Sequence, residues 1–176
     1  MSSVPRPLAV LDTSFWTVGF KAGVLGYALK LYRIVVPRQV EQEIRIPDRR
    51  YPQRVYPDTA LFDEVRHLLL SPPTPEPPAI ARFGAGEAAA IPLAETLNAT
   101  LLINDRRPAE YARGLGIRVT TLPGLIVLAR SRDYVATHVA EAMLRTCTQH
   151  GTSPALVQEA SLVLSALLVE RSAART

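Results

Sequence analysis

Short apolar runs alternate with longer amphipathic stretches over the first 120 residues. Residues 8–11 form a continuous apolar run, and residues 33–36, 100–103 and 117–120 are further short, strand-like segments. Continuous apolar runs are typical of strands that are buried on both faces of a sheet. Helical periodicity fills most of the intervals between them. The pattern therefore predicts a parallel sheet with helices on both sides, an α/β fold.

Glycine and proline delimit the helices expected in this region. The expected helices are residues 14–31, in two pieces; a helix that begins at Pro37; one from Asp58 or Thr59 to about Leu70; residues 86–97, with a kink at Pro92; and residues 108–115, ending at Gly116. The polar segment 47–57 is expected to be a loop. The proline-rich segment 71–78 is expected to be a stiff, extended connector.

The remainder of the chain, residues 122–173, is expected to form three helices. The last of them, about residues 153–169, is apolar over more than half of its circumference, whereas a surface helix needs only one apolar stripe. We therefore divide the chain into a domain of residues 1–130 and a helical extension of residues 131–176. The extension is expected to pack on the same domain or on the partner in a homodimer.

Composition excludes several classes of protein. The chain has 176 residues, 48% of them hydrophobic, and Cys147 is its one cysteine, which argues against a disulfide-stapled secreted module. No apolar run approaches the ~20 residues that cross a bilayer, and the first residues lack the features of a signal peptide. We expect a cytoplasmic protein. Its net charge is +4, with Lys21 and Lys30 the only lysines. This arginine excess suits a phosphate-rich partner, but a genomic bias also explains it.

Four acidic residues occupy positions that matter more than the net charge. Asp12 follows the first predicted strand, and Asp105 follows the third strand after Asn104. Ligands of parallel α/β sheets bind beyond such strand ends. Glu43 and Glu87 lie in helices that are otherwise apolar or alanine-rich. Each acid alone has a structural explanation, as a helix cap or a favourable partner of a helix dipole.

Gathered at one sheet edge, these carboxylates would have to take up protons or bind a cation. Hard oxygen ligands without histidine or cysteine favour Mg²⁺ or Mn²⁺ over zinc. The scattered histidines and the lone cysteine give no zinc-binding pattern. Gly84-Ala85-Gly86 is too short for a phosphate-binding loop. The residues thus predict an acidic divalent-metal site.

Four sequence blocks, in this order, resemble the PIN-domain family, and in particular the VapC-like toxin ribonucleases of prokaryotes. The blocks are Val10-Leu11-Asp12-Thr13-Ser14; Val36-Pro37-Arg38-Gln39-Val40-Glu41-Gln42-Glu43-Ile44; Gly86-Glu87-Ala88-Ala89-Ala90-Ile91; and Leu102-Ile103-Asn104-Asp105-Arg106 followed by Gly114-Leu115-Gly116-Ile117. The resemblance spans about residues 7 to 130. It implies a three-layer α/β/α domain with a central parallel sheet, to which this chain adds C-terminal helices.

The resemblance also implies a site and an activity. The family's acids correspond to Asp12, Glu43, Glu87 and Asp105, and its hydroxyl to Ser14 or, less favourably, Thr13. Together these acids would bind Mg²⁺ or Mn²⁺ and cleave single-stranded RNA, with a carboxylate such as Glu43 or Asp105 orienting the attacking water. The expected partners are RNA, a cognate antitoxin and a second copy of the chain, and no membrane.

Two departures from the family pattern keep alternatives open. Many relatives have an acid where Asn104 stands, so the fourth position can also be read one residue early. The helical tail is longer than in compact toxins. The alternatives are a weak or inactive PIN protein that binds RNA or a protein, and a DNA-processing nuclease.

RNA contacts are predicted on the loop after the Glu43 helix, where arginines alternate with tyrosines. The candidates are Arg49, Arg50, Tyr51 and Arg54, flanked by Arg45 and Tyr56, and then Arg106 and Arg107 beside Asp105. Arginine suits phosphate, and aromatic rings suit unstacked bases. The alternative is a solvated loop whose tyrosines pack on the domain, with Arg106 and Arg107 paired to neighbouring acids.

Overall fold

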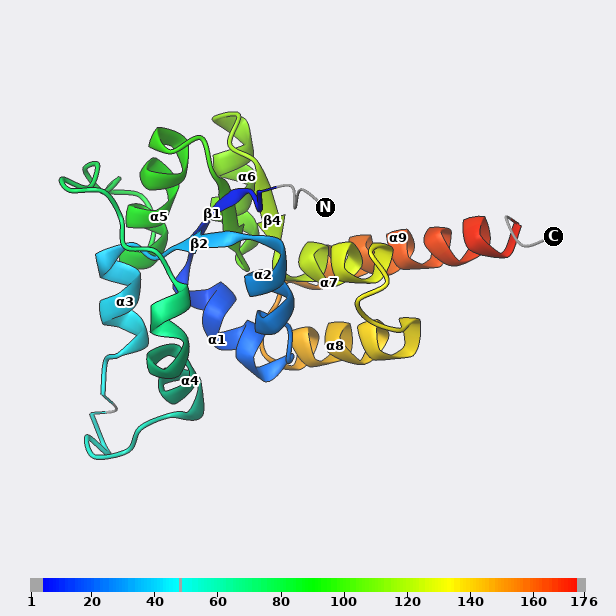
Figure 1. Ribbon diagram of the computed structural model, residues 1–176, viewed down its shortest axis with the longest axis horizontal. Helices are drawn as coiled ribbons and strands as arrows, with labels where there is room; N and C mark the ends of the chain where they lie inside the picture. Colours follow the sequence, from blue (N-terminus) through cyan, green and yellow to red (C-terminus); the bar gives the residue numbers. More distant parts are fainter. Residues whose placement is uncertain (1–4, 48, 174–176) are drawn as a thin grey trace.

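A computed structural model describes residues 5–47 and 49–173 and contains a four-stranded parallel sheet (Figure 1). The strands are β1 (Leu8–Leu11), β2 (Arg33–Val35), β3 (Thr100–Ile103) and β4 (Val119–Thr121), in the order β2-β1-β3-β4. The chain moves from β1 to β2 on one side and later returns to place β3 on the other side. The order therefore reverses between β1 and β3, which is where parallel sheets bind ligands.

Helices cover both faces of this sheet, as the alternation predicted. They are α1 (Thr13–Lys21), α2 (Leu25–Leu31), α3 (Arg38–Ile44), α4 (Pro57–Val65), α5 (Ala85–Thr96), α6 (Arg106–Gly114), α7 (Leu122–Ser131), α8 (Thr137–Gln149) and α9 (Pro154–Ala173). Neighbouring residues of one strand enter different cores. Leu11 packs in the core that includes α1, α7 and α8, whereas Val10 packs in the core that includes α5 and α6. The three-layer α/β/α fold is confirmed.

The expected helix up to Leu70 is wrong in its second half. Helix α4 ends at Val65, a short 3-10 turn η1 (Arg66–Leu68) follows, and Leu70 is extended. The Leu70 amide donates to the Ile34 carbonyl at 2.8 Å, and the Val36 amide donates to the Leu70 carbonyl at 3.0 Å. Pairing with strand β2, which is distant in sequence, outweighs the local helical pattern. Strand β4 also begins later than predicted, at Val119, and α6 begins earlier, at Arg106.

Pro92 lies inside α5 without ending it. Proline has no amide hydrogen, so the carbonyl of Ala88, four residues earlier, loses its helical partner. The Ile80 amide donates to that carbonyl at 3.0 Å. The segment that follows the proline-rich connector is thereby attached to the N-terminal half of α5.

The C-terminal part consists of three helices, as predicted. Inward-facing residues of α9, namely Leu156, Ala160 and Leu164, are buried, and α9 packs against α7 and α8. The last turns of α9 extend beyond the rest of the domain (Figure 1). Leu162 and Val163 lie on its exposed side. Among the described residues, no helix is both long enough and apolar enough to cross a membrane.

Candidate metal centre

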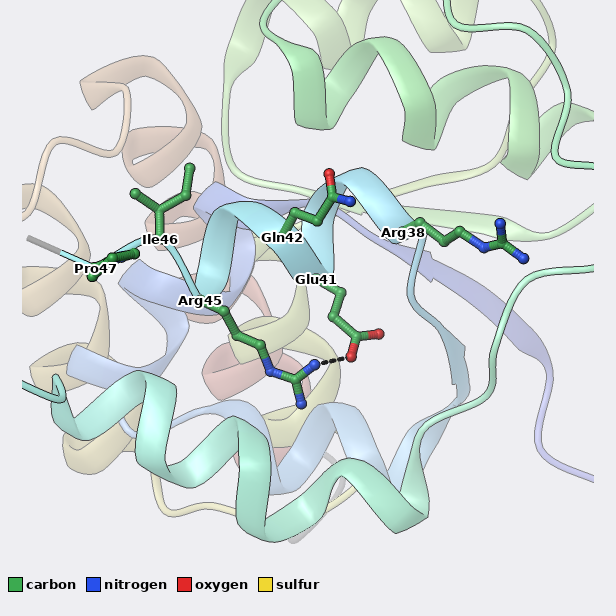
Figure 2. A pocket seen from close by; sticks show the side chains of 6 residues that line it. All are labelled: Arg38, Glu41, Gln42, Arg45, Ile46 and Pro47. Atoms are coloured by element: carbon green, nitrogen blue, oxygen red, sulfur yellow. Dashed lines mark hydrogen bonds and ion pairs between the residues drawn. The ribbon is translucent and has the colours of Figure 1, made fainter.

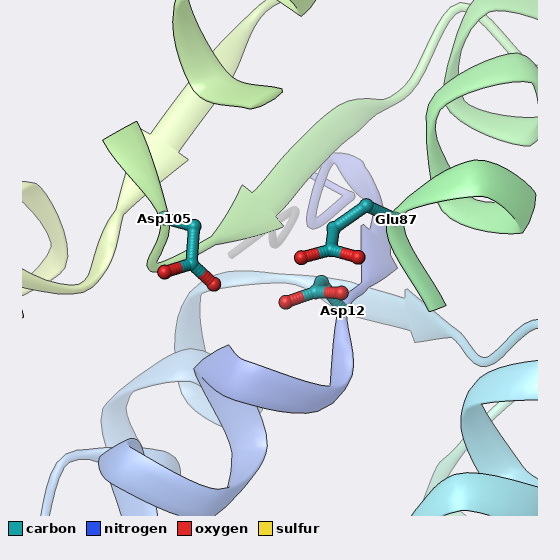
Figure 3. Close-up of side chains that lie close together, drawn as sticks. All are labelled: Asp12, Glu87 and Asp105. Atoms are coloured by element: carbon teal, nitrogen blue, oxygen red, sulfur yellow. The ribbon is translucent and has the colours of Figure 1, made fainter. Parts of the chain in front are cut away.

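Three carboxylates meet at the reversal point of the sheet (Figure 3). Asp12 follows β1, Asp105 follows β3, and Glu87 lies in the first turn of α5. One carboxylate oxygen from each lies within 4.8 Å of the others. The parallel strands bring the two aspartates to the same edge, and α5 adds the glutamate from the layer above. We call these three residues the acidic cluster.

Asp12 is the buried member of the acidic cluster, at 1% exposure. Its Oδ2 atom accepts hydrogen bonds from the Ser14 amide at 2.9 Å and from the Ser14 hydroxyl. Asp12 therefore caps α1 and also faces the other two carboxylates. Burial raises the pKa of Asp12 to about 7. The hydrogen bond from the Ser14 hydroxyl opposes this rise, and the negative charge of Glu87 adds to it. No lysine or arginine among the described residues forms an ion pair with this side chain.

Glu87 folds back over the beginning of its own helix. A Cβ atom on Gly84 would lie 2.5 Å from Glu87 Oε2, so the carboxylate occupies the space that a side chain would take. Burial raises the pKa of Glu87, and the charges of Asp105 and Glu43 add to the rise. The absence of a side chain at Gly84 thus allows Glu87 to point towards the cluster.

Glu43 lies beside the acidic cluster and is held by the other hydroxyl of the first block. Thr13 Oγ1 donates a hydrogen bond to Glu43 Oε2. A Cβ on Gly86 would lie 2.5 Å from Glu43 Oε2, 2.8 Å from Thr13 Oγ1 and 3.3 Å from Asp12 Oδ1. Three oxygen atoms from two separate segments, residues 12–13 and α3, therefore crowd against the backbone of Gly86. Ser14 orients Asp12, and Thr13 orients Glu43.

Asn104, the alternative fourth position, is engaged elsewhere. It is buried, and its Oδ1 atom accepts a hydrogen bond of 3.0 Å from Thr152 Oγ1, in the loop between α8 and α9. Asp105 makes no side-chain capping bond to α6. Its carboxylate points to Asp12 and Glu87 instead (Figure 3).

The donor set suits a divalent cation. None of Asp12, Glu43, Glu87 and Asp105 forms an ion pair with a lysine or arginine in the described ranges of the chain. A buried carboxyl with a raised pKa, next to two more carboxylates, is the arrangement that a cation stabilises. All the donors are hard oxygen atoms. Asp12, Glu87 and Asp105 are the residues that would hold such an ion.

A cavity of about 510 Å³ adjoins the acidic cluster. Glu87 and Asp105 line one part of it, and Arg106 and Arg107 line another. Arg106 forms an ion pair with Glu110 one turn along α6. Negatively and positively charged side chains therefore line the same cavity.

The arginine-rich loop predicted to contact RNA lies elsewhere. Arg49, Arg50, Tyr51 and Arg54 are exposed on the loop that joins α3 to α4, which projects away from the sheet (Figure 1). Tyr51 is 60% exposed and so does not pack on the domain. The structure does not bring this loop into the cavity beside the cluster. A separate pocket of about 460 Å³ lies at the near end of the loop, on the surface of α3 (Figure 2).

Sequence reasoning missed several contributors to this region. It ranked Thr13 below Ser14 and treated Gly84-Ala85-Gly86 only as a failed phosphate loop. Gly84 and Gly86, which lie three residues and one residue before Glu87, were the available signal, because small residues mark places where other atoms approach the backbone closely. Arg82 and Phe83 also line the cavity, and no motif pointed to them.

Comparisons with known proteins identify the family. A family model described as a PIN domain matches residues 8–160. Among solved structures, a PilT N-terminus domain protein from the hyperthermophilic archaeon Sulfolobus solfataricus is similar, with 21% identity and a TM-score of 0.47 over 67% of this chain and 89% of that chain. A comparison with curated proteins gives no significant match. PIN domains are generally metal-dependent nucleases. The chain belongs to the PIN-domain family.

Proposed function

We propose that this PIN domain is an endoribonuclease that uses Mg²⁺ or Mn²⁺ to cleave single-stranded RNA. The observation that carries the proposal is the acidic cluster, three carboxylates within 4.8 Å of one another that form no ion pair with a lysine or arginine of the described residues. The position of Asp105 in that cluster supports an active enzyme over an inactive relative, because the substitution at Asn104 does not remove a member of it.

Different residues of the site would hold the cation and position its ligands. When bound, the cation would act as a Lewis acid on a phosphoryl oxygen and lower the pKa of water. Asp12, Glu87 and Asp105 would hold the ion, and Ser14 keeps Asp12 Oδ2 in place through two hydrogen bonds. These contacts fix the first carboxylate before any substrate arrives, which limits reorganisation during the reaction.

Glu43 is the candidate general base. Thr13 occupies its Oε2 atom, and Oε1 makes no hydrogen bond to the described residues. Oε1 is therefore the atom that can accept a proton from the attacking water. The hydrogen bond from Thr13 and the close packing of Oε2 against Gly86 hold this side chain in place.

A cleavage assay tests the proposal directly. Purified protein is incubated with single-stranded RNA or single-stranded DNA of the same sequence, with Mg²⁺, Mn²⁺ or EDTA. We expect metal-dependent RNA cleavage that is lost in Asp12→Asn and kept in Glu41→Gln, a matched acid on the outside of α3. Cleavage of DNA alone would support the DNA-processing alternative, and no cleavage with either metal would contradict a nuclease.

A role as the toxin of a toxin–antitoxin pair rests on the four sequence blocks and is part of the same proposal. It predicts that expression of the chain arrests growth, that Asp12→Asn abolishes the arrest, and that a small neighbouring gene product relieves it. Growth unaffected by the intact protein would contradict this role without affecting the nuclease assignment.

The homodimer is proposed from α9. Leu162 and Val163 are 67% and 45% exposed on this helix, and Val169 is 70% exposed near its end. A second copy of the helix would cover these apolar side chains. Light scattering is expected to give twice the monomer mass of 19.3 kDa, and Leu162→Glu is expected to return the mass to that of a monomer. A monomer of the unaltered protein would contradict the dimer.

A further inference from the structure

The cavity beside the acidic cluster has walls of opposite character. Glu87 and Asp105 provide negative charge where the cation would bind, whereas Arg82, Arg106 and Arg107 provide positive charge on the remaining wall. A ligand that suits both parts has one group directed to a cation and another, negatively charged group directed to arginines. Successive phosphates of a nucleic acid strand meet this requirement.

The arginine wall also carries a flat apolar surface. Phe83 lines the cavity, and its ring packs edge-on against Tyr111 of α6, with centroids 5.3 Å apart. The Arg82 guanidinium lies 4.9 Å from the Tyr111 ring centroid and 5.9 Å from that of Phe83. These contacts hold a ring and a planar cation together at the rim. Both types of group stack on nucleobases when the bases are not paired in a duplex.

Helix α6 adds a further anion-binding feature to the same wall. It begins at Arg106, its first turn contains no acidic side chain, and Asp105 does not cap it because that carboxylate joins the acidic cluster. Arg107 is exposed and makes no hydrogen bond or ion pair with the described residues. The positive end of the helix and the Arg107 side chain thus face the cavity without a bound anion from the chain.

We infer that this cavity is a binding subsite for one unpaired nucleotide next to the scissile phosphate. Phe83 and Arg82 stack on its base, and Arg107, with the beginning of α6, binds its phosphate. The inference rests on the proposed nuclease function and adds the reason for a single-stranded substrate, since a paired base presents no free face to Phe83. It assigns new roles to Arg82 and Phe83, which lie outside the four sequence blocks.

The test measures binding rather than cleavage. Fluorescence anisotropy of a 5′-labelled single-stranded RNA is recorded in an Asp12→Asn background with EDTA, which removes metal-dependent cleavage. Phe83→Leu keeps an apolar side chain but removes the flat ring. It is expected to weaken binding of single-stranded RNA by roughly tenfold and to leave binding of a duplex of the same sequence unchanged.

Arg107→Ala provides a second variant, at an exposed position where folding is not at risk. It is expected to weaken binding and to lower the slope of log affinity against log salt by about one. Arg113→Ala, an exposed arginine at the other end of α6, is the matched control and is expected to bind like the parent.

The outcomes distinguish a failure of the proposed subsite from a failure of the proposed nuclease function. If Phe83→Leu and Arg107→Ala bind RNA as tightly as Arg113→Ala, the assignment of the cavity as a nucleotide subsite is wrong. Metal-dependent cleavage by the unaltered protein would in that case still support the nuclease proposal. An equal loss of duplex and single-strand binding in Phe83→Leu would also overturn the stacking role. A protein that neither binds nor cleaves RNA would overturn both proposals.

Discussion

Glu41 and Glu43 lie two residues apart on α3 and belong to acidic groups of opposite character. Glu41 faces outward and forms an ion pair with Arg45 (Figure 2). Glu41 also pairs with Arg66, and Arg45 also pairs with Asp63. We call these four residues the outer network. Glu43 faces inward, accepts a hydrogen bond from Thr13, and adjoins the three carboxylates of the acidic cluster.

The comparison distinguishes acidic residues that form structural ion pairs from acidic residues that are placed to bind a metal ion. In the outer network each carboxylate has an arginine partner supplied by the chain. In the acidic cluster no lysine or arginine of the described residues forms an ion pair with a carboxylate, although the three carboxylates lie within 4.8 Å of one another and Asp12 is buried. Burial of uncompensated charge lowers stability, so the presence of such a cluster in the folded protein indicates a functional site. The five predictions below test this contrast, in order of decreasing effect.

Replacement of Asp12 by Asn is expected to move activity and stability in opposite directions. The amide retains an oxygen that can accept both Ser14 hydrogen bonds, but it loses the charge that holds a cation. Nuclease activity should fall by more than about 100-fold. The metal-free protein should become more stable by on the order of 2 kcal/mol, because a buried charge is removed. Cleavage rates and urea unfolding check both effects, and a destabilised Asp12→Asn protein would contradict the contrast.

The stability of the metal-free protein is expected to depend on pH because of Asp12. Burial raises the pKa of Asp12 from 3.8 in an unfolded chain to about 7 in the folded protein. Between these values the folded state binds the proton more tightly, so stability falls as pH rises from about 4 to about 7 and is level above that. The total loss is on the order of 4 kcal/mol.

Thermal unfolding in EDTA measures this loss, and Mg²⁺ provides the complementary measurement. The cation competes with the proton, so it should raise the melting temperature more at pH 8 than at pH 5. The Asp12→Asn variant is the control and should show a weaker pH dependence. An equal Mg²⁺ effect at both pH values would argue against binding at the acidic cluster.

Gly86→Ala is expected to damage activity while changing stability little. The new Cβ would displace Glu43 Oε2 and Thr13 Oγ1, which removes the orientation of the proposed base. We expect activity to fall about tenfold, an effect of about 1.4 kcal/mol. The crowding lowers the stability of the fold, and the higher helix propensity of alanine offsets part of that loss. Gly26→Ala, in α2 with no atom within 4 Å of the added Cβ, is the control and should retain full activity.

Thr152→Val tests how much the contact between the α8–α9 loop and Asn104 contributes to stability. The variant keeps the shape of the side chain but leaves the buried Asn104 Oδ1 atom without its donor. The expected loss of stability is about 1 kcal/mol. Thr148→Val, whose hydroxyl donates to the Leu144 carbonyl within α8, should change stability less. Equal chemical denaturation curves for the two variants would show that the Asn104 contact contributes little.

Glu41→Gln should have the smallest effect. Its ion pairs are partly solvent-exposed, and such pairs contribute about 0–1 kcal/mol. Activity should not change, in contrast to substitution of Glu43 on the same helix. A large loss of cleavage in Glu41→Gln would remove the distinction between the two acidic groups.

Local sequence signals predicted the parts of the molecule that depend on neighbouring residues. Strand β3 lies at the predicted residues, and Asp12 and Asp105 follow strand ends whose positions were readable from apolar runs. Because parallel strands share a carboxyl edge, the meeting of these two aspartates followed from the fold class. Glu87 needed the family resemblance as well, since its position in a helix does not reveal which way it points.

The errors and omissions arise from contacts between distant segments. The helical pattern around Leu70 did not show that Ile34 and Val36 would pair with it. The Thr13 to Glu43 hydrogen bond joins residues 30 apart, and the Asn104 to Thr152 bond joins residues 48 apart. The arginine-rich loop has the composition of an RNA-binding segment, and its contact with RNA stays a prediction; its position away from the cavity could not be read from composition.

The hydrogen bond from the Ile80 amide to the Ala88 carbonyl, made available by Pro92, has a consequence for cleavage. It fastens the segment that carries Arg82 and Phe83 to the same helix that carries Glu87. The proposed base-stacking wall and the Glu87 member of the acidic cluster are therefore attached to the same helix. In the proposed ribonuclease, this attachment would keep the stacked base at a constant number of nucleotides from the phosphate that is cleaved, whatever the length of the RNA.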